Sequence, residues 1–200
     1  MTKGHFAALL LAPLIALVLA ARPAPAWEVD GMEVDVELVL AVDVSLSVTP
    51  HELDIQRRGY AEAIASPEVM TAIRAGLLGR VAVTYIEWAG AGAQRILVDW
   101  TLIEGEADAR AFAERLRTAP GSSLRRTSIS DALSFAAGLF DGNDYTGLRR
   151  VIDISGDGPN NSGRPVVQAR DAVLARGIVI NGLPLMTREG YGGRWDLEDL

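Results

Sequence analysis

The stretch Val36-Glu37-Leu38-Val39-Leu40-Ala41-Val42-Asp43-Val44-Ser45-Leu46-Ser47 decides the fold of this chain. It begins as an almost unbroken apolar run, which is typical of a strand covered on both faces. The run ends in three side chains with oxygen donors at alternate positions, namely Asp43, Ser45 and Ser47. Hard oxygen donors packed this closely are a cation-binding arrangement. The stretch therefore predicts a buried strand with a candidate metal site at its end.

A helix is predicted directly after this strand. Thr49 fits the N-cap, Pro50 the first helical position, and Glu52 the residue that closes a capping box. The three oxygen donors then lie at the carboxyl end of a strand, which is where open α/β sheets bind their ligands. The alternative is that they cap this helix and satisfy the turn without any metal.

The rest of the chain alternates strands and helices. We expect helices over 50–65, 67–76, 106–118, 127–140 and 165–176, and strands over 80–88, 94–103, 149–155 and 178–183. The short turn 89–92 predicts that the strands on either side of it form an antiparallel hairpin. The pattern predicts an α/β fold of three layers, α/β/α, with a doubly wound, mostly parallel sheet and one antiparallel edge strand.

The first 26 residues predict a secretory signal peptide. Their apolar run, 6–20, is too short for a membrane span, and Ala24-Pro25-Ala26 is a small-residue cleavage signal. We expect cleavage between Ala26 and Trp27, a secreted or periplasmic protein, and no stable membrane insertion afterwards; an uncleaved anchor is the alternative. Residues 27–34 would then be a lead-in, and 35–200 a single domain whose C-terminal end looks incomplete.

The charge of the chain argues against nucleic acid as a partner. Of the 19 basic residues, Lys3 and Arg22 lie in the leader, which leaves 17 against 26 acidic residues and a formal net charge of −9. Such acidity disfavours binding to nucleic acid or to an anionic membrane surface. The chain also has no cysteine, so we expect no disulfide framework.

Two further oxygen donors lie where they can converge on the end of the first strand. Thr127 precedes a helix, and Asp157 follows the strand 149–155. If that strand lies beside the first one in a parallel sheet, both carboxyl ends point at one crevice. Thr127 would arrive there from the loop above, so that the oxygen donors meet.

These residues together resemble the von Willebrand factor A-type domain and its metal-ion-dependent adhesion site (MIDAS). The Asp-x-Ser-x-Ser motif of that family matches Asp43, Ser45 and Ser47. Its loop threonine matches Thr127, and its distal Asp-Gly matches Asp157-Gly158. The resemblance covers most of the chain after the leader. It looks closest to a branch of secreted bacterial proteins whose distal motif reads Ser-Gly-Asp-Gly.

The resemblance implies a divalent metal, Mg²⁺ or Mn²⁺, bound directly by Ser45, Ser47 and Thr127. Asp43 and Asp157 would act mostly through water. An open coordination position would then accept an acidic side chain from a protein partner. On this basis we expect metal-dependent protein binding and no enzymatic activity.

Two alternatives remain open. One is a scaffold without a working metal site, because Gly156 is inserted where most of the family has Thr-Asp-Gly directly after the strand, and the extra residue would displace Asp157. The other is a phosphatase similar to the haloacid dehalogenases, which share a strand-end Asp and a later Gly-Asp-Gly. However, their general-acid position is Ser45 here, and their lysine is missing because Lys3 is the one lysine of the chain.

Other polar residues have less specific roles. Glu87 and Trp88 end a strand near the rim of the candidate site, and the polarity of an edge strand explains them as well. Asp153 lies inside an apolar strand, which predicts a buried carboxylate paired with an arginine. Arg125 and Arg126, next to Thr127, fit either an anionic partner or a solvated loop.

Overall fold

The structure is a computed structural model, and it describes residues 31–45, 48–120 and 124–185. In chain order its elements are β1 (Met32–Asp43), α1 (Pro50–Ile64), α2 (Pro67–Arg74), β2 (Val81–Trp88), β3 (Gln94–Ile103), α3 (Glu106–Thr118), α4 (Ile129–Gly138), β4 (Tyr145–Gly156), α5 (Val166–Leu174) and β5 (Ile178–Pro184). The predicted signal peptide 1–26, its cleavage point at Ala26, the oxygen donor Ser47 and residues 186–200 lie outside the described residues.

The sheet has five strands in the order β3-β2-β1-β4-β5. The central strand β1 pairs in parallel with β2 on one side and β4 on the other, and β4 pairs in parallel with β5. The strands β2 and β3 form the antiparallel pair, which places β3 at one edge. The predicted sheet, mostly parallel with one antiparallel edge strand, is therefore confirmed.

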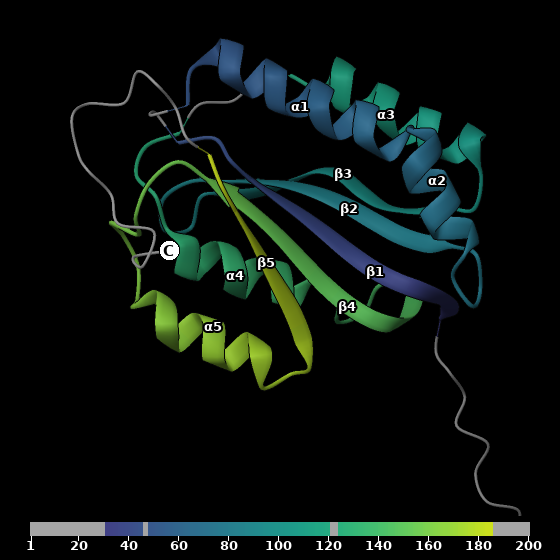
Figure 1. Ribbon diagram of the computed structural model, residues 1–200. Coiled ribbons are helices and arrows are strands. Elements are labelled where there is room, and N and C mark those ends of the chain that lie inside the picture. The colour runs from purple at the N-terminus through teal and green to yellow at the C-terminus, as the bar shows by residue number, and fades with distance from the viewer. Residues whose placement is uncertain (1–30, 46–47, 121–123, 186–200) are drawn as a thin grey trace, which may run out of the picture.

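Helices cover both faces of the sheet (Figure 1). The helices α1, α2 and α3 lie on one face, and α4 and α5 on the other. The central strand supplies side chains to both cores: Leu40 and Val42 pack with the first group of helices, and Val39 and Ala41 with the second. All four are buried. This double burial explains why β1 is an almost continuous apolar run in the sequence.

Two strands begin earlier than the sequence pattern predicted. Met32 to Val34 of β1 pair with Tyr145 to Gly147 of β4, so both strands extend together at their amino ends. Part of the predicted lead-in 27–34 therefore belongs to the sheet. Apart from the fully buried Val34, these extensions carry exposed or half-exposed side chains, and the pairing of the two backbones holds them in the sheet.

The structure corrects two interpretations of strand residues. Glu87 and Trp88 are fully buried, because β3 occupies the edge and β2 is an interior strand. Asp153 forms no ion pair with any arginine that the structure describes; its Oδ1 accepts a hydrogen bond of 2.7 Å from Nδ2 of Asn181 on the edge strand β5. That carboxylate is only half-buried, and a neutral amide is sufficient to satisfy it.

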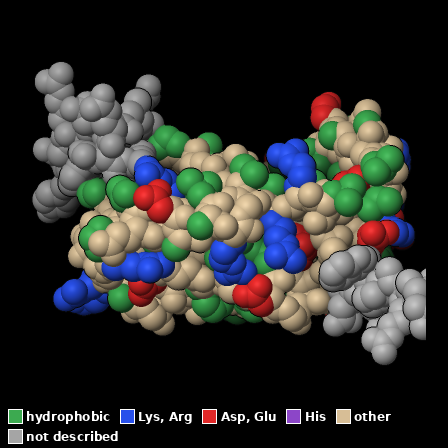
Figure 2. Space-filling view, turned by 90° about the horizontal axis from the view of Figure 1, so that it is seen from below, with side chains coloured by type: hydrophobic (Ala, Val, Ile, Leu, Met, Phe, Trp, Pro, Cys, Tyr) green, Lys and Arg blue, Asp and Glu red, His purple; other side chains and the backbone are tan. Residues whose placement is uncertain are grey.

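No helix within the described residues is long and apolar enough to cross a membrane. On the face that α4 and α5 form, charged side chains of both signs are interspersed with hydrophobic ones (Figure 2).

Candidate functional site

The end of β1 places two of the predicted donors in a tight turn. Asp43 is fully buried, and its Oδ1 accepts a hydrogen bond of 2.7 Å from the backbone N–H of Ser45, which is itself 2% exposed. The helix α1 starts as predicted: the N–H of Glu52 donates to Thr49 Oγ1 at 3.2 Å, and the N–H of Thr49 donates to Glu52 Oε2 at 2.8 Å. Thr49 and Glu52 thus cap α1, so this helix needs no cap from Asp43.

The loop before α4 brings Thr127 to the same end of the sheet. At the start of the loop, the N–H of Leu124 donates to the carbonyl of Val44 at 3.0 Å. At its other end, the N–H of Ser128 donates to the carbonyl of Ala89, the residue after β2, at 2.7 Å. Thr127 is 5% exposed between these two attachments. The loop is therefore fixed across the ends of β1 and β2.

The loop after β4 carries Asp157 and reaches Thr127. Asn161 fastens it there: its N–H donates to the carbonyl of Thr127 at 3.0 Å, and its Oδ1 accepts from the N–H of Thr127 at 2.9 Å. The negative charge of Asp157 contributes to a raised pKa of Asp43, so these two carboxylates lie within electrostatic reach. The sequence analysis missed Asn161. The feature of the sequence that could have indicated Asn161 is the run of turn-forming residues 158–161 directly after Asp157.

Gly156 packs directly against the Asp43 carboxylate and does not simply lengthen a loop. It is the last residue of β4. A Cβ at this position would lie 3.3 Å from Asp43 Oδ2 and 3.3 Å from Cζ2 of Trp88. A larger residue would crowd both groups, whereas glycine leaves room beside the carboxylate. The sequence analysis left open whether Gly156 displaces Asp157; the following Asp157 lies within electrostatic reach of Asp43.

Several polar atoms in this region are buried without a hydrogen-bond partner in the described part of the chain. They are Asp43 Oδ2, Trp88 Nε1 and Ser155 Oγ. Burial raises the pKa of Asp43 to about 6, against the lowering effect of hydrogen bonds from Ser45 and from the backbone N–H of Asp157. A buried, unpaired carboxylate oxygen is costly, and a cation or a metal-bound water is the kind of group that satisfies it.

The donor set fits a hard divalent cation. Asp43 and Asp157 are the two carboxylates, and Ser45 and Thr127 supply buried hydroxyl groups at the same end of the sheet. Oxygen donors of this kind suit Mg²⁺, which retains several waters. The described residues contain no group of three or more His, Cys, Asp or Glu that would hold a metal by itself. The role of these residues as metal ligands therefore stays a prediction.

A buried ion-pair network supports the site from the α1 side. Glu87 accepts from Nε of Arg57 at 3.1 Å and from Nη2 of Arg95 at 2.7 Å. Arg57 also donates to the carbonyl of Ala119 at 2.8 Å, and both arginines donate to the carbonyl of Pro120. The network anchors the segment that leads from α3 towards Thr127. Its long-range partners cannot be identified from the sequence pattern.

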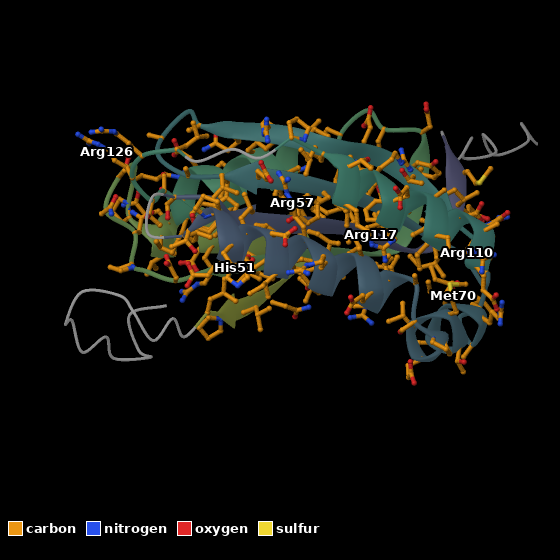
Figure 3. All side chains as sticks on the ribbon, turned by 90° about the horizontal axis from the view of Figure 1, so that it is seen from above. His51, Arg57, Met70, Arg110, Arg117 and Arg126 are labelled. Atoms are coloured by element: carbon orange, nitrogen blue, oxygen red, sulfur yellow. The ribbon has the colours of Figure 1, made fainter. Side chains whose placement is uncertain are left out.

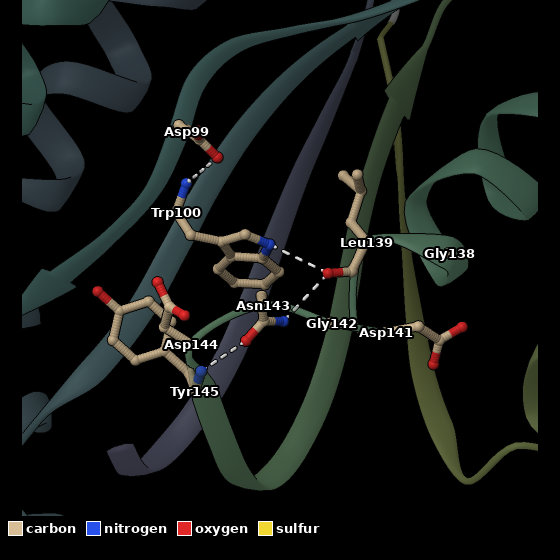
Figure 4. Close-up of a pocket in the computed structure, with 9 residues that line it drawn as sticks. All are labelled: Asp99, Trp100, Gly138, Leu139, Asp141, Gly142, Asn143, Asp144 and Tyr145. Atoms are coloured by element: carbon tan, nitrogen blue, oxygen red, sulfur yellow. Dashed lines mark hydrogen bonds between the residues drawn. The ribbon is translucent and has the colours of Figure 1, made fainter. Parts of the chain in front are cut away.

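A hollow of about 360 Å³ lies at the opposite end of the sheet (Figure 4). It is near the start of β4, whereas Asp157 follows the end of that strand. Its polar groups satisfy one another: Trp100 Nε1 donates to the carbonyl of Leu139 at 3.1 Å, and Asn143 Nδ2 donates to the same carbonyl at 3.0 Å. The hollow is therefore separate from the candidate metal site.

Several solved structures share the fold. An aerotolerance-related membrane protein from Bacteroides fragilis is 22% identical, with a TM-score of 0.52 over 82% of this chain and 79% of that chain. The mussel byssus protein PTMP1, with a zinc-occupied MIDAS motif, is 16% identical, with a TM-score of 0.53 over 80% and 38%. The pilus adhesin SpaC from Lactobacillus rhamnosus GG is 12% identical, with a TM-score of 0.55 over 79% and 26%.

At these identities the likeness establishes the fold alone, an α/β fold like that of von Willebrand factor A-type and Rossmann domains. This chain spans less than half the length of the byssus and pilus proteins. A search of curated proteins finds no match to the sequence. A model of the family described as "Protein of unknown function (DUF1194)" matches residues 33–199, which is most of the chain. The chain therefore belongs to the DUF1194 family.

Proposed function

We propose that this domain binds Mg²⁺ or Mn²⁺ at the carboxyl end of β1 and uses the ion to hold a carboxylate of a protein partner. The observation that carries the proposal is the buried Asp43 carboxylate, whose Oδ2 has no hydrogen-bond partner among the described residues. A buried charge is retained when it is paired or when it serves a metal. No described arginine forms an ion pair with Asp43, and this supports the second role.

The surrounding residues suit such an ion. The hydroxyls of Ser45 and Thr127 would bind it directly, together with Ser47, which lies outside the described residues. Asp43 and Asp157 would hold its bound waters. Neutral hydroxyls leave much of the positive charge of the ion uncompensated, which favours an anionic ligand at an open position.

The similar structures add support of a limited kind. One of them is described with zinc in a MIDAS motif, and another is a pilus adhesin. Both descriptions are compatible with a metal-binding adhesive function for this chain.

Isothermal titration calorimetry tests the metal site. Mg²⁺ and Mn²⁺ are titrated into the wild type and into Ser45→Ala/Thr127→Ala. We expect heat of binding from the wild type and a loss of this heat in the double variant. Thr71→Ala is the control, because its exposed hydroxyl donates to the carbonyl of Pro67 within α2, which leads into the amino end of β2, away from the site. Equal heats in the wild type and the double variant would refute the proposal.

The proposal describes a binding module and not an enzyme. A phosphatase assay with p-nitrophenyl phosphate tests this part, and we expect no turnover. Turnover that Asp43→Asn abolishes would favour the phosphatase alternative. We also propose that the domain acts outside the cytoplasm after cleavage between Ala26 and Trp27, which N-terminal sequencing of the exported protein tests.

A further inference from the structure

Two exposed arginines lie directly before the predicted metal ligand Thr127. The structure describes 15 arginines, and ten of them form ion pairs with carboxylates. Arg125 and Arg126 are among the five that pair with no described carboxylate, although the chain as a whole is acidic. Their guanidinium groups are therefore available to an external anion.

The backbone that carries these arginines is held in an unfavourable conformation. Arg126 has φ of 69°, the one positive value outside glycine among the described residues. This left-handed conformation costs an arginine about 1 kcal/mol or more. Such a conformation persists where the surrounding structure fixes it, and it is frequent at functional sites.

The cause of this conformation is close packing against the turn after β2. Gly90 donates its N–H to the carbonyl of Arg125 at 3.2 Å. A Cβ on Gly90 would lie 2.7 Å from that carbonyl oxygen and 3.0 Å from Cβ of Arg126. The loop is thus pressed onto a glycine, and its ends are fastened to Val44 and Ala89 by the hydrogen bonds described above. Figure 3 shows Arg126 projecting outward from this end of the molecule.

We propose that Arg125 and Arg126 form a second anchor for the partner, so that the site selects an acidic peptide segment with several carboxylates. One carboxylate would bind the metal ion, and a neighbouring one would bind the guanidinium pair. Arginine suits this role because its planar group donates two parallel hydrogen bonds to a carboxylate. Because the backbone of the loop is fixed, only the two arginine side chains have to be ordered on binding. The inference rests on the proposed function for the first carboxylate.

The experiment compares two end-capped peptides by fluorescence anisotropy with the full chain in Mg²⁺. One probe carries a single Asp among Gly and Ser, and the other carries Asp followed by Glu-Glu. We expect the wild type to bind the second peptide about fivefold more tightly, as two exposed ion pairs provide. In Arg125→Gln/Arg126→Gln the ratio of the two affinities falls to about one. Arg110→Gln/Arg149→Gln, which removes two exposed arginines elsewhere, keeps the wild-type ratio.

Several outcomes would overturn the inference. They are an unchanged ratio in Arg125→Gln/Arg126→Gln, equal affinities of the wild type for both peptides, and no binding of either peptide. The calorimetric Mg²⁺ titration is run on the same proteins and separates the two proposals. Normal metal heat in the arginine variant with a lost preference supports the anchor. If the wild type gives no heat of Mg²⁺ binding, the proposed function fails. The arginine anchor then stands only if the wild type still prefers the Asp-Glu-Glu peptide in EDTA and Arg125→Gln/Arg126→Gln does not.

Discussion

Replacing Asp43 by Asn tests how the buried carboxylate is used. Burial raises the pKa of Asp43 from 3.8 to about 6. Its charged form is therefore disfavoured in the folded, metal-free protein. One pKa unit corresponds to about 1.4 kcal/mol, so ionised Asp43 lowers the free energy of unfolding by about 3 kcal/mol at neutral pH. Asn retains the Oδ1 acceptor for the N–H of Ser45 and carries no charge.

The sign of the pH dependence follows from the raised pKa. Below about pH 4 the carboxyl group of Asp43 is protonated in both the folded and the unfolded protein, and its contribution to the stability of the fold is then fully present. This contribution is lost as the pH rises from about 4 through 6, because the Asp43 carboxyl group ionises at a lower pH in the unfolded chain than in the folded protein. In EDTA we therefore expect Asp43→Asn to be more stable than the wild type by up to about 3 kcal/mol at neutral pH, and similar to it near pH 4.

Urea unfolding in EDTA at both pH values measures this difference. Asp54→Asn is the control: its exposed carboxylate pairs with Arg58 on α1, so we expect a change within about 0.5 kcal/mol. Mg²⁺ should then stabilise the wild type and not Asp43→Asn. A less stable Asp43→Asn at neutral pH in EDTA, or a difference that does not vary with pH, would refute the reasoning.

Three other substitutions test the packing around the site. Gly156→Ala places a methyl group 3.3 Å from the buried Asp43 carboxylate and from the indole ring of Trp88. We therefore expect the free energy of unfolding to fall by about 1 kcal/mol and the binding of Mg²⁺ to weaken. Gly158→Ala, whose new methyl group would have no atom within 4 Å, should change neither the stability nor the Mg²⁺ affinity, and calorimetry measures both. Glu87→Gln leaves the buried Arg57 without its counterion, so we expect the free energy of unfolding in urea to fall by about 3 kcal/mol. The exposed Glu114→Gln should lower it by about 0.5 kcal/mol. Equal losses in the two variants would contradict this prediction. Arg126→Gly removes the cost of a positive φ, so we expect the free energy of unfolding, measured by thermal unfolding, to rise by about 1 kcal/mol. A lower free energy of unfolding in this variant would show that the loop is not strained.

The part of the fold that depends on local chemistry was predictable from the sequence. The apolar run of β1, the Thr49–Glu52 capping box and the hairpin of β2 and β3 are set by residues close together in the chain. The spacing of Asp43 and Ser45 likewise places them in one turn. Parallel pairing of β1 with β4 then explains why the loop after β4 reaches the same end.

Other properties of the site were decided by contacts between distant segments. Glu87 is buried because β3 covers the edge of β2, and its partner Arg57 comes from α1. The hydrogen bonds of Asn161 to Thr127 join segments that are 34 residues apart. The raised pKa of Asp43 depends on desolvation, which exists only after the layers pack together. Sequence by itself thus determined which oxygen donors this protein has and on which loops they lie. The tertiary structure decided their burial and their partners, because the electrostatic environment of a side chain depends on all the segments that surround it.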